Sequence, residues 1–546
     1  MAVDSTPTND LVQEGTGRLQ TIGYVLQAVA LLVLVASFAL LFEVVDAQSL
    51  VAGQSVLTWM GLGFGVLGLG FVAVAGLSRA DLVESTPIKS AGVGAGIVYA
   101  LIGFVVVGLV SSQTLGLQTL WVIPAILAGG LVFLGAVYPR EDIGSTLPAA
   151  GFMVFAGTTF LTGTIGLDWT WQPIPNGAVF DASMALIVTG FFGGLLGAWT
   201  AARAGNGFGS RGRQSGAYLL VSVNAVAMAA LLFALVTFVA VRGWAPMTRG
   251  IKTGIFWEPV YWFYFQPIQE YVIFQIPGLW FYWPFTMEGA ALMNDINGVA
   301  PAIIGTFWLV VGAILFAVPL GVGAAVFLTE YAEQGRFTQL VEISTNGLWS
   351  TPSIVYGLFG LALLVPRLGN SNSILTGMLV LGFMLLPLVV ITSRESLKSV
   401  PDEYRDASAA LGVSQWQTIK SVVLPAAMPG VITGVILGVG RIAGETAPIL
   451  LVTGGSPFPS TGADIFDPRF AFTGQFPWVS LNIVNVDPLL QPSSALPYQL
   501  YAVISAGLSE NLSFAWGTAL VLLLVVLGFY AIGIASRAYF RRKLQA

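Results

Sequence analysis

The sequence of 546 residues contains no cysteine and no histidine. These absences exclude disulfides, thiolate or imidazole metal ligands, cysteine nucleophiles and histidine general bases. Charged residues are also scarce, at 9% of the chain, whereas soluble proteins carry about 25%. Because so few charges cannot cover a surface that faces water, most of the surface must face an apolar surrounding.

Hydrophobic residues make up 56% of the chain, and glycine (65) and tryptophan (15) are abundant. This composition is typical of packed transmembrane helices with tryptophan at the membrane surfaces. A bilayer core needs about 20 apolar residues per helix, which predicts an all-α polytopic membrane protein of about 12 transmembrane helices. The predicted spans are 22–42, 56–77, 91–111, 119–138, 147–167, 181–201, 217–241, 301–328, 346–366, 373–393, 427–453 and 514–536.

The positive-inside rule gives the orientation, since most of the 22 lysines and arginines fall in alternate connections between these spans. We therefore expect a multi-pass protein of the cell membrane with both termini in the cytoplasm. The first apolar run, 22–42, is long enough to remain as a span, and the residues before it do not form the basic start of a signal peptide. Lipid is the implied surrounding, and no nucleic-acid partner is expected.

The chain divides near residues 203–215, a basic, glycine-rich stretch that predicts a flexible cytoplasmic linker. Residues 1–210 hold about six spans whose role the sequence does not reveal, and 211–546 hold the rest. No repeat relates the halves, which gives an inverted-repeat carrier little support. Two long connections fall on the outer side, at 242–300 and 454–513. The first is rich in aromatic residues, which favours an interfacial helix or aromatic belt, with a docking surface for an external partner as the alternative.

The cytoplasmic connection 394–426 carries the most specific pattern. Ser399-Val-Pro-Asp-Glu403 predicts a helix start, and Gly412 suits the end of that short helix. Ser414-Gln-Trp-Gln417 then predicts a capping box that opens a second short helix, which Leu424-Pro425 ends. We expect a compact helix–turn–helix outside the bilayer, suited to a groove of another protein.

The string Glu403-Tyr-Arg-Asp-Ala-Ser-Ala-Ala-Leu-Gly412 resembles the coupling motif of ABC importer permeases, E-A-A-x-x-x-G followed by I-x-x-x-x-L-P. In that family this segment docks on a separate ATP-hydrolysing subunit. Asp406 stands where glutamate is commonest, which keeps the charge, and Ser408 stands at the second alanine. The resemblance implies ATPase coupling through Glu403, Asp406, Ala407, Ser408, Gly412, Ile419 and Pro425.

Three further strings resemble PstA-type permeases of phosphate importers: Leu328-Thr-Glu-Tyr331, Ser350-Thr-Pro-Ser-Ile-Val355 and Gly440-Arg-Ile-Ala-Gly-Glu-Thr-Ala-Pro448. The resemblance covers about residues 217–241 and 300–540. It implies an ABC importer permease domain in 211–546, with a core at 300–540, that moves inorganic phosphate into the cytoplasm. The implied partners are a PstC-like paired permease, PstB-like ATP-binding subunits and an external PstS-like phosphate-binding protein. Residues 1–210 and 242–300 lie outside a minimal six-span permease.

Arg441 is the only basic residue within a predicted span, and Glu445 lies one helical turn further on. Ionisable residues inside a membrane usually face a cavity or a pathway, so we expect Arg441 to offer forked donors to an anion while Glu445 limits retention. The alternative is an ion pair that only locks two helices together. Ser350, Ser353 and Thr446 either line the same pathway or satisfy backbone groups, such as the carbonyl freed by Pro352.

No G-x-x-x-x-G-K-[ST] pattern occurs, so the chain does not bind ATP through a Walker A loop. No metal cluster, cofactor motif or nucleophile–base set is evident, and we expect a transport subunit that is not itself an enzyme. A permease for another oxyanion, such as sulfate or molybdate, is the first alternative. A self-contained 12-span carrier or channel without an ATPase is the second.

Overall fold

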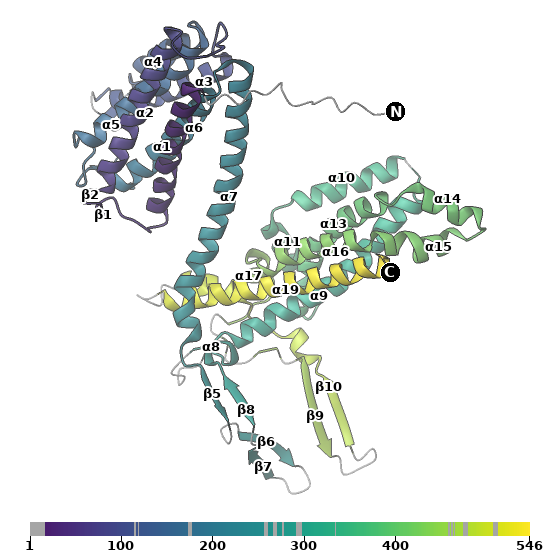
Figure 1. Cartoon of the computed structure of the whole chain (residues 1–546). Helices are drawn as coiled ribbons and strands as arrows, with labels where there is room; N and C mark the ends of the chain where they lie inside the picture. The colour runs from purple at the N-terminus through teal and green to yellow at the C-terminus, as the bar shows by residue number, and fades with distance from the viewer. Residues whose placement is uncertain are drawn as a thin grey trace, which may run out of the picture. The chain divides into compact units, whose positions relative to one another are not determined.

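A computed structural model describes residues 17–545 apart from 114–115, 118, 173–176, 256–259, 266–269, 276–277, 291–296, 334, 457–458, 460–461, 464, 473–478 and 506–511. The chain forms two compact units, 1–234 and 235–546 (Figure 1).

The first unit is a bundle of apolar helices. Its helices are α1 (Arg18–Leu41), α2 (Val56–Arg79), α3 (Val93–Gln113), α4 (Val122–Val137), α5 (Glu141–Leu161), α6 (Ala182–Gly205) and the first part of α7 (Gly209–Thr248). Ser55 and Asp181 cap α2 and α6 by accepting hydrogen bonds from backbone amides. Two short ladders, β1–β2 (Leu50–Val51, Gln54–Ser55) and β3–β4 (Thr170–Trp171, Phe180–Asp181), precede those helices.

Helices pack in pairs in this unit, α1 with α6, α2 with α5 and α3 with α4. Phe64, Leu67 and Phe71 fill the centre and are fully buried. Small residues allow the closest approach: a Cβ on Gly23 would collide with the backbone of Gly205. This use of glycine is typical of membrane helix packing.

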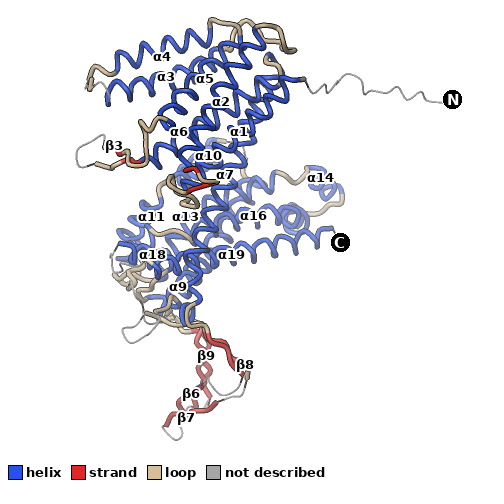
Figure 2. The backbone as a smooth tube through the Cα atoms, turned by 60° about the vertical axis from the view of Figure 1, so that its left-hand side comes forward, coloured by secondary structure: helices blue, strands red, loops and turns tan. Residues whose placement is uncertain are grey.

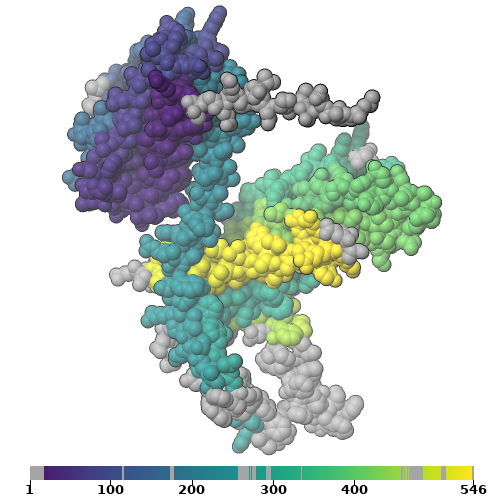
Figure 3. All heavy atoms as spheres, viewed as in Figure 1, coloured from purple at the N-terminus to yellow at the C-terminus, as the bar shows by residue number. Residues whose placement is uncertain are grey.

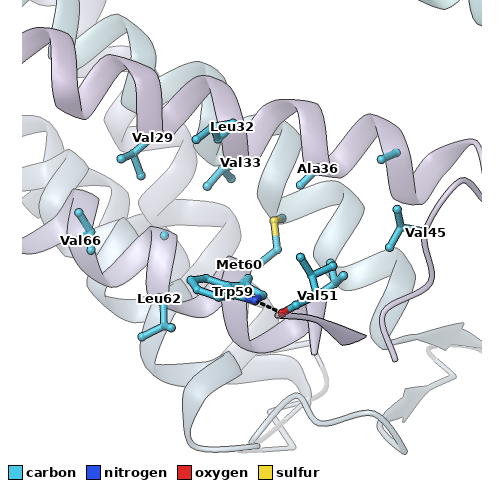
Figure 4. Close-up of a pocket in the computed structure, with 13 residues that line it drawn as sticks. Val29, Leu32, Val33, Ala36, Val45, Val51, Trp59, Met60, Leu62 and Val66 are labelled. Atoms are coloured by element: carbon cyan, nitrogen blue, oxygen red, sulfur yellow. Dashed lines mark hydrogen bonds between the residues drawn. The ribbon is translucent and has the colours of Figure 1, made fainter. Parts of the chain in front are cut away.

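A groove of about 460 Å³ lies between α1 and α2 (Figure 4). Aliphatic side chains such as Val33 and Leu62 line it together with Met60 and Trp59, and the indole of Trp59 donates its N–H to the carbonyl of Val51 at 2.8 Å. Since the indole donor is already used, the groove presents no donor to an anion and is suited only to hydrocarbon.

The second unit contains α8 (Pro284–Met287), α9 (Ala300–Val326), α10 (Arg336–Ser350), α11 (Ser353–Phe359), α12 (Val365–Arg367), α13 (Ile374–Lys398), α14 (Asp402–Ala410), α15 (Gln415–Thr418), α16 (Leu424–Ala443), α17 (Ala447–Val452), α18 (Leu496–Ser505) and α19 (Ser513–Gln545). Four short π or 3₁₀ turns join them: η1 (Phe327–Tyr331), η2 (Gly360–Leu364), η3 (Ile419–Val423) and η4 (Asp487–Leu490). Helix α13 is central, packing against both α9 and α16. Leu381, Leu385 and Val389 of α13 are buried in that core.

Antiparallel hairpins extend from one end of the second unit. Strand β5 (Lys252–Ile255) pairs with β8 (Leu279–Tyr282), β6 (Val260–Phe265) pairs with β7 (Glu270–Gln275), and β9 (Phe466–Phe472) pairs with β10 (Val479–Val484). The interfacial helix expected within 242–300 is therefore wrong, because the described part of that segment after α7 is mainly strand. In Figures 1 and 2 the hairpins lie at the end of the unit opposite α14 and the C-terminus.

Hydropathy predicted where most helices lie, but it did not predict the breaks within them. Ten helices of the described chain are long and apolar enough to cross a membrane, and an eleventh span results if the bent pair at 336–367 is counted. Of the twelve predicted spans, 119–138 corresponds to α4, which at 16 residues is short of that length. The spans 346–366 and 427–453 are both interrupted by breaks.

The flexible linker expected at 203–215 is also wrong. Helix α6 continues to Gly205 and α7 begins at Gly209, leaving a tight turn between them. Phe208, which has a positive φ of 62°, is fully buried in that turn.

Candidate functional site

Helices α10 and α11 meet at a sharp bend of 102°. Pro352 has no backbone N–H, so it cannot donate to the carbonyl four residues earlier, that of Leu348. The hydroxyl of Tyr356 donates to that carbonyl at 2.9 Å instead. The hydroxyls of Ser350 and Thr351 both donate to the carbonyl of Gly347. Ser350 therefore bonds a backbone carbonyl, but that of Gly347 and not the Leu348 carbonyl freed by Pro352.

A second break separates α16 from α17 at residues 444–446. The chain leaves helical geometry after Ala443 and resumes it at Ala447, with Thr446 as the N-cap residue but without a side-chain hydrogen bond to the helix. Space is open beside Gly444, where an added Cβ would meet no atom within 4 Å. The predicted span 427–453 is thus two helices with an exposed glycine between them.

The two breaks lie side by side. Gly357 of α11 packs on Pro448 of α17, and an added Cβ at Gly357 would lie 2.7 Å from the Cα of Pro448. The guanidinium of Arg441 lies over the ring of Trp349, 4.2 Å from its centroid. Discontinuous helices that meet in this way are typical of substrate sites in membrane transporters.

Arg441 occupies the last turn of α16, where a cation is favoured by the helix dipole. Its Nε lies 3.9 Å from Oε1 of Glu445, beyond hydrogen-bonding distance. The side chains of Arg441 and Glu445 are 33% and 18% exposed. Trp349 therefore contacts the guanidinium closely and Glu445 only loosely, which leaves donors of Arg441 available. Ser353, at the first position of α11, is half-buried.

Residues 402–418, which we expect to couple to an ATPase and call the coupling segment, fold as two short helices, α14 and α15, joined by a turn at Gly412. The amide of Val413 donates to the carbonyl of Ser408 at 3.2 Å, and that of Gly412 donates to Ala409 at 2.9 Å. This pair of bonds is a Schellman motif, which requires a left-handed residue at its centre. Gly412 supplies that residue with a φ of 72°.

The residues that we expected to couple to an ATPase fall into two groups. Glu403, Asp406 and Ala407 are exposed on α14, and Gly412 is exposed in the turn. Ser408 and Ile419 are buried, and Pro425 is half-buried in the first turn of α16. The first group can touch a partner, whereas the second fixes the segment to its own helices.

Two predicted caps are wrong. Ser399 is the C-cap of α13, and Pro401 rather than a serine precedes α14. Ser414 precedes α15 as its N-cap residue, but its side chain accepts no hydrogen bond, so the capping box does not form.

A polar latch, which sequence analysis missed, holds α14 in place. Arg405 donates to both carboxylate oxygens of Glu330, from Nη2 at 2.8 Å and from Nε at 3.2 Å. The carbonyl of Glu330 also accepts the side-chain amide of Gln415 at 2.6 Å. The hydrogen bond to Glu330 raises the pKa of Arg405 above its ordinary value, so this cation keeps its charge.

Comparison with known proteins decides the family. The model of the family "Binding-protein-dependent transport system inner membrane component" matches residues 317–546. "Probable ABC transporter permease protein YqgI" of Bacillus subtilis is 34% identical over 234 residues, which cover 43% of this chain and 75% of that protein. The chain belongs to the binding-protein-dependent transport permeases. It is thus a multi-pass inner-membrane subunit of an ABC importer, and not itself an enzyme.

Relatives named for a substrate are equally similar to this permease. "Phosphate transport system permease protein PstA 1" of Mycobacterium tuberculosis is 34% identical over 245 residues, covering 45% of this chain and 72% of that one. "Phosphate transport system permease protein PstA" of Haemophilus influenzae is 33% identical over 250 residues, covering 46% and 78%. A solved chain of the MetNI methionine ABC transporter aligns with a TM-score of 0.32 at 16% identity, covering 44% of this chain and 94% of that one.

The N-terminal unit of the permease carries a buried charge cluster. Arg203, 2% exposed, donates to Oε1 of Glu141 at 2.7 Å. The other oxygen of Glu141 accepts the backbone amides of Ile88 and Gly209 at 3.2 and 2.9 Å. This carboxylate therefore joins α5, α6, the start of α7 and the connection before α3, which explains why 203–215 is not a loose linker.

Arg441 is not the only basic residue within a helix of this permease. Helix α6 extends through Arg203 and α13 extends through Arg394, and both are more buried than Arg441. Sequence analysis placed both arginines in connections because their helices run one turn further than the apolar runs. Across the described residues, no group of three or more metal-ligating side chains is assembled.

Proposed function

We propose that this chain is the PstA-type permease subunit of an ATP-driven importer that moves inorganic phosphate into the cytoplasm. The observation that carries the proposal is Arg441 placed where two broken helices meet, with Trp349 on its face and donors free. The similarity to several permeases named for phosphate supports it.

The geometry suits transient binding of an oxyanion. Planar guanidinium donors match the oxygens of phosphate. The carboxylate of Glu445, 3.9 Å from Nε of Arg441, repels an anion bound to that arginine, so binding remains weak enough for release. The hydroxyls of Ser353 and Thr446 are at the two breaks, and Ser350 is exposed just before the first. We propose these five residues, Arg441, Glu445, Thr446, Ser350 and Ser353, as the pathway.

The partners follow from the same proposal. The exposed residues Glu403, Asp406 and Ala407 would dock on PstB-like ATP-binding subunits, while a PstC-like permease would complete the pathway. A PstS-like phosphate-binding protein would deliver substrate from outside. Alternating access would come from movement of α14 and α15 as the ATP-binding subunits close.

The orientation is part of the proposal. An ATP-binding subunit lies in the cytoplasm, so α14 and α15 would face that side. The C-terminus lies at the same end of the second unit as α14, and the β-hairpins lie at the opposite end (Figures 1 and 2). This arrangement supports a cytoplasmic C-terminus and an outer location for 242–300. We propose a cytoplasmic N-terminus from the charge pattern alone.

The domain division is also a proposal: residues 1–210 form an N-terminal extension and 211–546 the permease domain, with its core at 300–540. An assembly or regulatory role suits the extension. Deleting it and measuring complex formation separately from uptake would distinguish these roles.

The decisive experiment is phosphate uptake by the complete complex in proteoliposomes, with sulfate as competitor. We expect phosphate uptake that excess sulfate does not suppress. Arg441→Ala should abolish it at unchanged protein level, while Arg367→Gln, which removes an exposed arginine at the far end of α12, should not. Wild-type uptake by the Arg441→Ala complex would end the proposal.

A permease for another oxyanion is the second candidate, because the YqgI relative carries no substrate in its name. Suppression of phosphate uptake by equimolar sulfate or molybdate would favour it.

A further inference from the structure

A second arginine lies buried in the permease, and the pathway described so far does not use it. Arg394 of α13 has a side chain only 10% exposed. Its Nη1 forms an ion pair with Oε1 of Glu342 on α10, whose side chain is 38% exposed. Its Nε is buried and has no hydrogen-bond partner. Burying such a donor without a partner costs free energy, so it calls for an explanation.

The register of α10 relates this arginine to Arg441. Glu342 and Trp349 are seven residues apart on α10, which is two helical turns, so they lie on the same face about 10 Å apart along the axis. Glu342 contacts Arg394, and Trp349 contacts Arg441. One face of α10 therefore carries two guanidinium groups in succession.

The packing of α13 on α16 gives the same order. Gly430, Gly434 and Gly438 of α16 face Ser396, Thr392 and Leu385 of α13, respectively, so these helices run antiparallel in close contact. Arg394 thus lies level with the segment between Gly430 and Gly434, near the start of α16. Arg441 lies beyond Gly438, near its end.

Arg394 is on the side of the coupling segment. Helix α13 ends at Lys398, four positions further on, and α14 begins at Asp402. Arg441 is 16 residues beyond Pro425, or about 24 Å along α16 from the coupling segment. An anion that leaves Arg441 toward the cytoplasmic side would therefore reach Arg394 next.

We propose that Arg394 is a second anion-binding station, which receives the transported oxyanion from Arg441 before its release. This inference rests on the proposed function and adds a site to it. The Nε and Nη2 donors form the edge of a guanidinium that binds an oxyanion through two parallel hydrogen bonds. Because Nε has no partner, Glu342 leaves that edge incomplete. The carboxylate of Glu342 holds the empty station neutral and competes with the anion, as Glu445 does beside Arg441.

A purely structural ion pair is the competing explanation. Such a pair stabilises the fold most when the carboxylate accepts hydrogen bonds from both Nε and Nη2 of the arginine and every buried donor has a partner. Arg405 and Glu330 show that arrangement in the same chain, with both Nε and Nη2 bonded. Arg203 beside Glu141 also keeps an unpaired buried Nε, so what favours a ligand at Arg394 is the unpaired Nε together with the position of Arg394 between Arg441 and the coupling segment.

The test uses the complete complex in proteoliposomes and measures how inorganic phosphate on the ATP-containing, cytoplasmic side inhibits uptake. A station near that side binds phosphate there and blocks release. In the wild type we expect inhibition by millimolar phosphate. Arg394→Gln should require about tenfold more phosphate for half-inhibition, the effect of one charge-assisted hydrogen bond. Glu342→Gln should require less, because it removes the competing carboxylate.

The double variant Arg394→Gln/Glu342→Gln separates the two explanations. If Arg394 is a station, the double variant behaves as Arg394→Gln does. If the pair is structural, both single variants lose uptake and thermal stability together, and the double variant recovers them. Arg367→Gln is the matched control and should leave half-inhibition unchanged.

Recovery in the double variant, equal shifts in both single variants, or a wild type that cytoplasmic-side phosphate does not inhibit would each overturn the station. None of these results contradicts phosphate import itself, which is judged by wild-type uptake and by Arg441→Ala. Absence of wild-type phosphate uptake would instead reject the proposed function.

Discussion

Arg405 and Glu330 are 75 residues apart in the chain, and two hydrogen bonds join their side chains. Arg405 belongs to α14, and Glu330 to η1, the turn that continues α9. The same guanidinium also donates to the backbone carbonyls of Leu397 and Val400. In the proposed importer, a movement of α14 would therefore be passed directly to α9 and α13.

Replacing Glu330 by glutamine should weaken this transmission. The variant loses the charge that pairs with Arg405, so ATP hydrolysis should continue while phosphate uptake per ATP falls several-fold. The measurement is the ratio of uptake to ATPase activity in the reconstituted complex. Asp402→Asn is the control, because this second partner of Arg405 is 91% exposed and contributes little. An unchanged ratio for Glu330→Gln would refute the role of the latch.

Gly412→Val should release the ATP-binding subunit. A β-branched residue at a φ of 72° costs about 1–2 kcal/mol or more and destroys the turn between α14 and α15. Co-purification of the ATP-binding subunit with the intact chain measures the effect. Ala407→Asp should give the same loss from the exposed face of α14. Normal co-purification of both variants would show that the partner docks elsewhere.

Trp349→Leu should slow phosphate uptake several-fold, since a partly buried cation–π contact contributes about 1 kcal/mol to holding Arg441. Trp349→Phe should retain part of the rate, because a smaller aromatic face remains. Initial uptake rates at matched protein level give the comparison. A leucine variant as fast as the wild type would mean that the ring does not orient the guanidinium.

Glu141→Gln should destabilise the N-terminal unit by about 3–5 kcal/mol, because Arg203 would remain buried without its counter-ion. Thermal unfolding of the full chain and protease cleavage within 203–215 would report the change. Glu84→Gln, which alters an exposed carboxylate whose backbone lies close to Gly207, serves as the control. If both variants resist the protease equally, the contacts of Glu141 do not hold residues 203–215 in place.

Much of the helical framework could be predicted, because long apolar runs bounded by polar residues have few other stable forms in lipid. The breaks within those runs could not be predicted from the sequence. The peptide around Pro352 contains apolar residues on both sides, and the bend is stabilised by hydrogen bonds to the carbonyl of Leu348 from the amide of Thr351 and the hydroxyl of Tyr356. Hydropathy averages over such positions, so 346–366 and 427–453 each read as one span.

The candidate site was predicted in part. Arg441 and Gly412 could be identified from local sequence, since a charge in an apolar run and a glycine after a short helix are local signals. Trp349, Glu330 and Glu342 could not, because their partners lie 92, 75 and 52 residues away in sequence and depend on tertiary packing. Leu328-Thr-Glu-Tyr331 was the only sequence signal for Glu330, and it gave no role.

Helix α7 runs through 40 residues from Gly209 to Thr248 without interruption. A gene cut at codon 210 would sever it at its first turn and leave Gly209, whose amide Glu141 binds, one residue from a free chain end. A separately expressed N-terminal half is therefore expected to persist only when its end is moved well into α7, near residue 234. Half-molecules that end at 210 and at 234 should differ in yield for that reason alone.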